Sequence, residues 1–218
     1  MTIRMKAVVF TNGQYENLSF YKNYLEGQEA FQVICADGGA NAAHALGVTP
    51  QLLVGDMDSI HAELLADYSE EGVTIDHHST HKDETDTELA IEYCIKNGFD
   101  EVVIFGALGS RFDHSFGNLY LLNRLLKEGV RGEIVNENNR VFLVKDRAVL
   151  DVPVGTTVSI LAFTDQASGI NIEGFEYPVK NGVMAHFFPG YGISNVTVEK
   201  CPEISVEQGI LMVDIVNE

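Results

Sequence analysis

Short apolar runs rich in β-branched residues alternate with stretches of helical periodicity over the first 130 or so residues of the chain. Such alternation is typical of βα units that build a mainly parallel sheet with helices packed on it. Strands are predicted at residues 6–10, 32–36, 51–54, 73–76 and 101–105. The clearest helices are predicted at residues 40–46, 61–69, 87–97 and 114–127. The first half of the chain is therefore predicted to be an α/β domain.

The pattern changes after Val135, where short alternating runs such as RVFLV and ILMVDIV are separated by turns rich in Pro and Gly. No helical period continues there, and frequent turn signals between short strands are typical of a small antiparallel sandwich or barrel. We therefore expect a mainly parallel-sheet α/β domain at residues 1–135, followed by a small, sandwich-like all-β domain at residues 136–218.

The charge balance narrows the choice of ligand. The 218 residues include 14 Lys and Arg against 32 Asp and Glu, which gives a formal charge of −18. Nucleic acid is not an expected partner, because a phosphate backbone is bound by clustered basic residues. The negative charge of the protein would repel a small anionic substrate, and a bound metal ion could offset this repulsion.

Several features bear on where the protein works. The longest apolar runs are strand-length, far below the ~20 residues needed to span a bilayer. The first apolar stretch ends at Phe10, which is too short for a secretory signal. The cysteines Cys35, Cys94 and Cys201 are widely separated and form no CxxC pair, which argues against a disulfide scaffold or a structural zinc site. We expect a cytoplasmic protein without a membrane partner.

Residues with binding chemistry follow the second predicted strand, in the sequence CADGGAN. In open α/β sheets, ligands bind beyond the carboxyl ends of the strands. Gly38 and Gly39 permit close approach of the backbone to a ligand, and the following helix offers unpaired N–H groups, as in a phosphate-binding cradle. The alternative is an ordinary turn in which Asp37 caps the helix. Neither a Rossmann fingerprint nor a P-loop is present.

A pair of carboxylates follows the third strand, in the sequence GDMDS. If the chain stays extended, Asp56 and Asp58 project to the same side and can share a hard divalent cation. Without a cation, two such charges ~4 Å apart repel by about 4 kcal/mol at an effective dielectric constant near 20. The alternative is that Asp58 or Ser59 only caps the next helix.

The fourth strand leads into a polar segment that ends in KDETDTELA. Thr85 and Glu88 form a capping box before the apolar-periodic run, which places Asp86 in the first helical turn. Helix capping accounts for Thr85 and Glu88, but it does not account for the presence of Lys82 in this segment. Three histidines nearby, at positions 77, 78 and 81, invite a transition-metal interpretation, but neither a cysteine nor a spaced helical His pair completes such a site.

The fifth strand runs into GALGSRFDH. Its glycines again permit close approach of a ligand, Arg111 offers a planar donor fork suited to phosphate, and Asp113 adds a carboxylate. The alternative is that Asp113 caps the long helix while Arg111 pairs with a surface acid. Each cluster is ordinary alone, but four at successive strand ends indicate a site.

These motifs match a known family in order and spacing. The segments CADGGAN, GDMDSI, KDETDTELA and GALGSRFDH, followed by GISN at residues 192–195, closely resemble bacterial thiamine pyrophosphokinases over essentially the whole chain. The resemblance implies transfer of the pyrophosphoryl group of ATP to the hydroxyl of thiamine, giving thiamine diphosphate and AMP with Mg²⁺. It also implies an α/β nucleotide domain, an all-β thiamine domain, and a homodimer with active sites at the interface.

The resemblance also suggests roles for individual residues. It implies catalytic roles for Asp58, Asp86, Asp113 and Arg111, a metal site at Asp56, Asp58 and Asp86, ATP binding by Asp37, Gly38, Gly39, Asn41, Lys82, Thr85 and Arg111, and thiamine binding by Ser194 and Asn195. The chain has no Trp, so aromatic stacking on thiamine would have to use Tyr or Phe, unless another residue type takes that place.

Two alternatives come from other classes of protein. The string Asp76-His77-His78 after an apolar strand, with the Asp56 and Asp58 pair upstream, resembles the DHH metal-dependent phosphoesterases, but residues 51–55, directly before that pair, contain no His. The other alternative is a non-catalytic nucleotide- or thiamine-binding module, which would have no reason to keep the full set of acidic residues. Hydrolysis of a phosphate ester without an acceptor substrate would favour the phosphoesterase. Binding of nucleotide or thiamine without turnover would favour the non-catalytic module.

Overall fold

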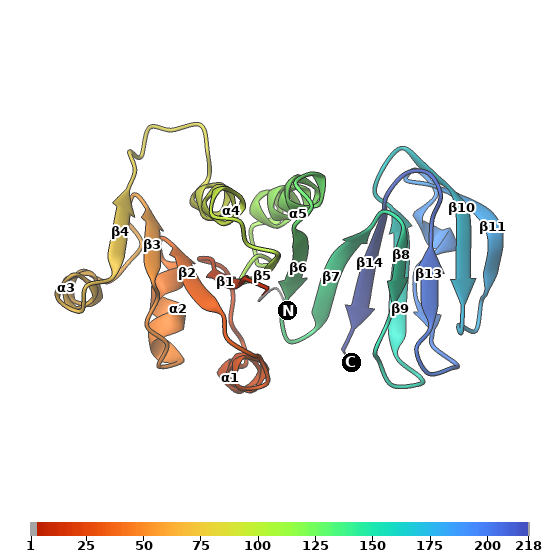
Figure 1. Cartoon of the computed structure of the whole chain (residues 1–218), viewed down its shortest axis with the longest axis horizontal. Helices are drawn as coiled ribbons and strands as arrows, with labels where there is room; N and C mark the ends of the chain where they lie inside the picture. The colour runs from red at the N-terminus through yellow and green to blue at the C-terminus, as the bar shows by residue number, and fades with distance from the viewer. Residues whose placement is uncertain (1–3, 218) are drawn as a thin grey trace. The chain divides into compact units, whose positions relative to one another are not determined.

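The computed structural model describes residues 4–217, and the chain divides into two compact units after Glu137. The first unit is a six-stranded, fully parallel sheet in the order β6-β5-β1-β2-β3-β4. Its elements are β1 Lys6–Phe10, α1 Leu18–Glu26, β2 Gln32–Ala36, α2 Gly39–Ala45, β3 Leu52–Gly55, α3 Ala62–Glu70, β4 Thr74–His77, α4 Asp86–Lys96, β5 Glu101–Phe105, α5 Phe112–Lys127 and β6 Arg131–Val135. Figure 1 shows α4 and α5 on one face of this sheet and α1 and α2 on the other.

The predicted α/β class is confirmed, and two further elements appear. The helix α1 begins after Asn17, whose side chain accepts hydrogen bonds from the N–H groups of Ser19 and Phe20. It is rich in aromatic residues, which are weak helix formers, so its periodicity is hard to detect in the sequence. The strand β6 contains Glu133, which is buried and pairs with Arg131 at 2.9 Å. A buried charge in a strand breaks the apolar pattern on which strand prediction relies.

The second unit is a sandwich of two antiparallel sheets. One pairs its strands in the order β12-β9-β14-β7 and the other in the order β11-β10-β13-β8. Buried side chains of both sheets form one core, from Val158 and Leu211 on one side to Ile170 and Ile204 on the other. The strands are β7 Asn139–Val144, β8 Arg147–Val149, β9 Thr157–Ala162, β10 Gln166–Glu173, β11 Val179–Ala185, β12 Asn195–Val196, β13 Glu203–Ser205 and β14 Leu211–Val216. In the described residues, no helix is both long and apolar enough to cross a membrane.

Asp214 is an ionisable residue in an unusual place within β14. It alternates with the core-facing residues of its strand and lies between Val141 of β7 and Ser159 of β9. Its Oδ1 atom is buried without a hydrogen-bond partner among the described residues. Burial therefore raises the pKa of Asp214 from 3.8 to about 6.

This carboxyl makes folding stability depend on pH. Because its pKa is higher in the folded than in the unfolded chain, the folded state holds more protons between pH 4 and 6, and stability falls as the pH rises through that window. We expect Asp214→Asn to raise the free energy of unfolding at pH 7.5 by about 1 kcal/mol, after allowing for partial contact with solvent, and to change little near pH 4. Urea titrations at both pH values measure this effect. The exposed control Asp151→Asn should show no such difference, and equal effects of Asp214→Asn at both pH values would contradict the account.

Candidate active site

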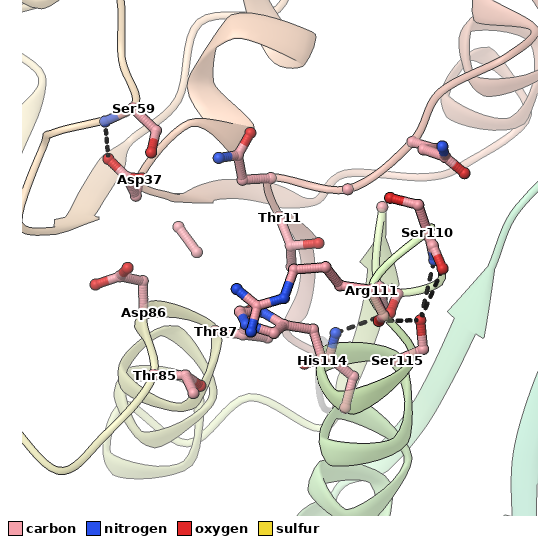
Figure 2. A pocket seen from close by; sticks show the side chains of 18 of the residues that line it. Thr11, Asp37, Ser59, Thr85, Asp86, Thr87, Ser110, Arg111, His114 and Ser115 are labelled. Atoms are coloured by element: carbon pink, nitrogen blue, oxygen red, sulfur yellow. Dashed lines mark hydrogen bonds between the residues drawn. The ribbon is translucent and has the colours of Figure 1, made fainter.

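One cavity of about 600 Å³ lies at the carboxyl ends of the parallel strands, as expected for an open α/β sheet. Residues that follow β1, β2, β3 and β5 line it, together with the first residues of α4 and α5. Figure 2 shows Asp37 and Asp86 on one side of this cavity and Arg111 and His114 on the other. The four motifs that the sequence analysis identified therefore contribute to a single site.

The side chains of three aspartates, Asp37, Asp56 and Asp58, converge in the cavity, and we refer to these three residues as the carboxylate group. Asp37, Asp56 and Asp58 each place a carboxylate oxygen within 4.8 Å of the others. Asp37 is buried, and its Oδ1 accepts a hydrogen bond from the Ser59 N–H at 3.2 Å. Such a group of hard oxygen donors suits Mg²⁺, and a cation would relieve the mutual repulsion of the carboxylates. These residues therefore fit a magnesium ion.

A tight turn, not an extended strand, brings Asp56 and Asp58 together. Asp56 Oδ1 accepts the Asp58 N–H at 3.3 Å, and Met57 between them has a φ of +64°. A left-handed backbone is unfavourable for a residue with a long side chain, so the surrounding structure must hold it in place. Met57 is buried in the core of the unit, and this packing supplies the constraint. The chain is therefore not extended at this point, which was the condition for the two side chains to project to the same side, but their carboxylates do lie together.

Asp86 lines the same cavity, but it pairs with Lys82 and is not one of the three residues of the carboxylate group. It is the first residue of α4, and Thr85 caps that helix by accepting the Glu88 N–H at 3.1 Å. Its Oδ1 pairs with Lys82 Nζ at 2.8 Å, and the Lys82 side chain is largely buried. The same oxygen would lie 2.8 Å from a Cβ atom at Gly55, so the carboxylate sits against the end of β3. Lys82 is thereby held beside Asp86, although Lys82 itself is not among the residues that line the cavity.

Close contacts at glycines join the loops around the cavity, and Gly13 and Gly106 are themselves among the residues that line it. A Cβ atom at Gly13 would lie 1.8 Å from the Gly106 carbonyl oxygen, and one at Gly39 would lie 2.2 Å from the Phe10 carbonyl oxygen. A Cβ atom at Gly38 would lie 2.5 Å from the side chain of Asn12, which can move aside more easily than backbone. The backbone contacts at Gly13 and Gly39 therefore bring the loops after β1, β2 and β5 together at distances that only glycine permits.

The loop after β1, residues 11–14, is a contributor that the sequence analysis missed. Thr11, Asn12, Gly13 and Gln14 all line the cavity, and the Thr11 hydroxyl donates to the Phe105 carbonyl at 2.9 Å. The sequence did hold a signal, because these polar residues directly follow an apolar strand. None of these four residues carries a charge, so the charged and glycine-rich motifs by which the other loops are recognised are absent here.

Asn41 and Arg111 have well-defined partners. The Asn41 amide donates to the Ser59 carbonyl at 2.9 Å and accepts from the His61 N–H at 3.2 Å, so it ties α2 to the loop that carries Asp58. Arg111 lines the cavity and pairs with Asp113 at 2.5 Å, which lowers the pKa of that carboxyl. Both side chains of this pair are exposed, and Asp113 itself is not among the lining residues.

His77, the last residue of β4, and His78 and His81 after it are not members of the carboxylate group. His78 Nε2 lies 3.2 Å from Asp76 Oδ2, within the same segment of chain. Among the described residues, the group whose ligand atoms converge consists of Asp37, Asp56 and Asp58 alone. The geometry therefore favours a hard, oxygen-liganded cation over a transition metal.

The second unit has a smaller cavity of about 260 Å³, lined by Tyr177, Tyr191, Glu176 and Asn195. Asn195 is buried and clamps the backbone of Tyr177, because its Oδ1 accepts the Tyr177 N–H at 3.1 Å and its Nδ2 donates to the Tyr177 carbonyl at 2.9 Å. Ser194 is exposed and is not among the lining residues, and its N–H donates to Ser159 Oγ at 3.1 Å. Pairing between segments eighteen residues apart thus fixes one wall of this cavity.

The protein is thus of the two-unit α/β plus β-sandwich class. The first unit has converging carboxylates at the carboxyl edge of its parallel sheet, and the second unit has a pocket of its own. The family model described as thiamin pyrophosphokinase, catalytic domain, matches residues 22–134. A second family model, thiamin pyrophosphokinase, vitamin B1 binding domain, matches residues 145–211. The chain therefore belongs to the thiamine pyrophosphokinase family, and these matches do not favour the phosphoesterase or the non-catalytic alternative.

Individual relatives agree with this assignment. The thiamine pyrophosphokinase of Bacillus subtilis is 26% identical over 184 residues, which cover 82% of this chain and 84% of the relative. Thiamine pyrophosphokinase 1 of Oryza sativa is 31% identical over 132 residues, covering 51% of this chain and 49% of the relative. Among solved structures, the Bacillus subtilis thiamine pyrophosphokinase superposes with a TM-score of 0.86 at 22% identity, covering 99% of this chain and all of that one, which shows a shared fold.

Proposed function

We propose that this chain is a thiamine diphosphokinase in which the first unit binds ATP with Mg²⁺ and the second unit binds thiamine. The family supports transfer of the pyrophosphoryl group of ATP to the hydroxyl of thiamine, with release of AMP. The observation that carries the proposal is the convergence of three carboxylates in a cavity at the strand ends of the unit that matches the catalytic domain. A transfer reaction on a polyphosphate requires a bound cation that offsets the negative charge of the phosphate oxygens, and these carboxylates could hold one.

The carboxylate group is the proposed metal site. Asp37, Asp56 and Asp58 would hold the ion, with Asp86 close by in the same cavity. When bound, Mg²⁺ would offset the negative charge of the phosphate oxygens and orient the polyphosphate. Lys82, which pairs with Asp86, is proposed to bring a positive charge close to the phosphates.

The remaining residues of the cavity suit the transfer step. The thiamine hydroxyl attacks the β-phosphorus, the bond from that phosphorus to the bridging oxygen of the α-phosphate breaks, and AMP leaves. Asp113 accepts hydrogen bonds from Nε and Nη2 of Arg111, and the remaining guanidinium N–H groups are proposed to donate to the phosphate oxygens. Asp86 lines the cavity and is the proposed acceptor of the hydroxyl proton, although a loose transition state needs little help from a base.

The pocket of the second unit suits thiamine. Thiamine carries a permanently cationic thiazolium ring, and aromatic faces and carboxylates attract such cations. Tyr177 and Tyr191 provide the rings, and Glu176 is the charged residue among those that line the pocket. We place Asn195 in the site as the clamp that holds Tyr177, and Ser194 at its border. The working enzyme is proposed to be a cytoplasmic homodimer.

Removal of the Tyr177 ring should weaken the use of thiamine but not the use of ATP. We expect Tyr177→Ala to raise the KM for thiamine about tenfold through loss of stacking and cation–π contact, while the KM for ATP changes less than twofold. Steady-state kinetics with each substrate varied in turn measure both constants. Tyr177→Phe keeps the ring and should stay close to the parent protein. Equal increases in both KM values would place Tyr177 outside the thiamine pocket.

Product analysis tests the proposed function. Purified protein is incubated with ATP, Mg²⁺ and thiamine, the nucleotides are separated, and thiamine diphosphate is followed as its oxidised fluorescent derivative. We expect AMP and thiamine diphosphate in equal amounts. ATP breakdown with thiamine unchanged would overturn the proposal and support a hydrolase, and binding without any product would support a non-catalytic module.

A further inference from the structure

The side chain of Tyr15 closes the loop after β1, residues 11–14. Its hydroxyl donates a hydrogen bond to the Thr11 carbonyl at 2.9 Å, four residues back along the chain. Burial raises the pKa of this hydroxyl well above its ordinary value, so the group keeps its proton and acts as a donor. All four residues of the loop line the cavity of the first unit, whereas Tyr15 is not among the lining residues. Tyr15 therefore holds the loop without entering the cavity itself.

The same hydroxyl lies where the loops after β1 and β5 meet. A Cβ atom at Gly106, which lines the cavity, would lie 2.6 Å from the Tyr15 hydroxyl oxygen and 2.7 Å from the Thr11 carbonyl oxygen. Thr11 is also tied to the end of β5, because its N–H and its hydroxyl both donate to the Phe105 carbonyl, at 3.0 Å and 2.9 Å. A single hydroxyl group thus contacts two of the loops that form the cavity.

The ring of Tyr15 is held by its neighbours in the core of the first unit. It stacks on Phe10 with ring centroids 6.2 Å apart, and its centroid lies 4.9 Å from that of Tyr21. The Tyr21 hydroxyl donates to Glu137 Oε2 at 2.9 Å, and Glu137 Oε1 accepts the Asn17 N–H at 2.7 Å. Glu137 therefore fixes the beginning of α1, and the Tyr21 ring on that helix supports the Tyr15 ring.

We propose that Tyr15 is a positioning residue for ATP, whose hydroxyl holds residues 11–14 in the shape that binds the nucleotide. This inference rests on the proposed function, because it requires that the cavity of the first unit binds ATP. A loop that is already ordered binds its ligand more tightly, since no further ordering is needed on binding. The four residues are uncharged, so they are expected to contact bound ATP and the transition state about equally. Loss of the hydroxyl should then weaken ATP binding without slowing the transfer step.

Removal of this one hydroxyl tests the proposal. We expect Tyr15→Phe to raise the Kd for ATP about tenfold, measured by isothermal titration calorimetry with Mg²⁺ and without thiamine. The KM for ATP should rise by about the same factor, whereas kcat and the KM for thiamine should change less than twofold. The ring and its packing remain, so the circular dichroism spectrum should match that of the parent protein.

Tyr21→Phe is the matched control. It removes the hydroxyl of the adjoining ring and keeps the ring that supports Tyr15, and neither Tyr21 nor Glu137 is among the residues that line the cavity. A hydrogen bond to a carboxylate stabilises more than one to a carbonyl. The thermal midpoint should therefore fall at least as far as in Tyr15→Phe, with the Kd for ATP within twofold of the parent value. An unchanged Kd in Tyr15→Phe, or equal increases in both variants, would overturn the proposal.

The binding measurement also separates this proposal from the proposed function. A parent protein that binds ATP but makes no thiamine diphosphate fails the proposed function alone, because the Kd values of the two variants still decide the role of Tyr15. A parent protein that binds no ATP overturns both.

Discussion

Replacement of Asp58 by Asn is expected to lower kcat about a thousandfold while the fold stays intact. Asp58 is the exposed member of the carboxylate group, and its loss removes one charged oxygen ligand where phosphate charge must be offset. Without Mg²⁺, the thermal midpoint should stay the same or rise, because the substitution removes repulsion from Asp37 and Asp56. Kinetics at saturating Mg²⁺ and ATP, together with thermal unfolding in EDTA, measure the two effects.

The matched control for this substitution is Asp83→Asn. Asp83 is an exposed carboxylate before α4 and is not among the residues that line the cavity. It should retain full activity. If Asp58→Asn also kept activity within threefold of the parent protein, the carboxylate group would not be the metal site.

Gly13→Ala should abolish productive ATP binding. The added Cβ atom would lie 1.8 Å from the Gly106 carbonyl oxygen, so the loops after β1 and β5 would have to separate. Overpacking of this kind costs about 1–3 kcal/mol of stability, and here it also deforms the cavity of the first unit, because Gly13 and Gly106 both line that cavity. We expect kcat/KM for ATP to fall at least a hundredfold, measured by initial rates with ATP varied.

Gly117→Ala is the control for the glycine substitution. Gly117 lies within α5, and a Cβ atom there would meet nothing within 4 Å. Alanine is the better helix former, so this variant should be about 0.5–1 kcal/mol more stable and fully active. Unchanged kinetics in Gly13→Ala would show that the close approach of the two loops is not needed for ATP binding.

Local sequence patterns were enough to predict the two-part architecture and most strands of the first unit. Apolar runs such as residues 101–105 are continuous because strands of a parallel sheet are buried on both faces. The pattern failed where packing overrode it. The strand β6 contains the buried Glu133, and the aromatic helix α1 has low intrinsic helical preference.

The polar residues that follow the strands indicated where the candidate site lies, but not which of its residues lie next to one another. Asp37 lies with Asp56 and Asp58, whereas Asp86 is paired with Lys82. This grouping depends on a left-handed turn at Met57 and on contacts between loops, which spacing in the sequence does not encode. The Asn195 clamp on Tyr177 depends in the same way on pairing between distant segments.

Isotope transfer tests the central claim most directly. The protein is supplied with Mg²⁺, thiamine and ATP that carries a label in the β-phosphate, and in a parallel reaction with ATP labelled in the γ-phosphate. A pyrophosphoryl transferase delivers both labels to thiamine diphosphate and leaves unlabelled AMP. The account is contradicted if the β-label remains in ADP while thiamine monophosphate forms, or if both labels leave as free phosphate or pyrophosphate with thiamine unchanged.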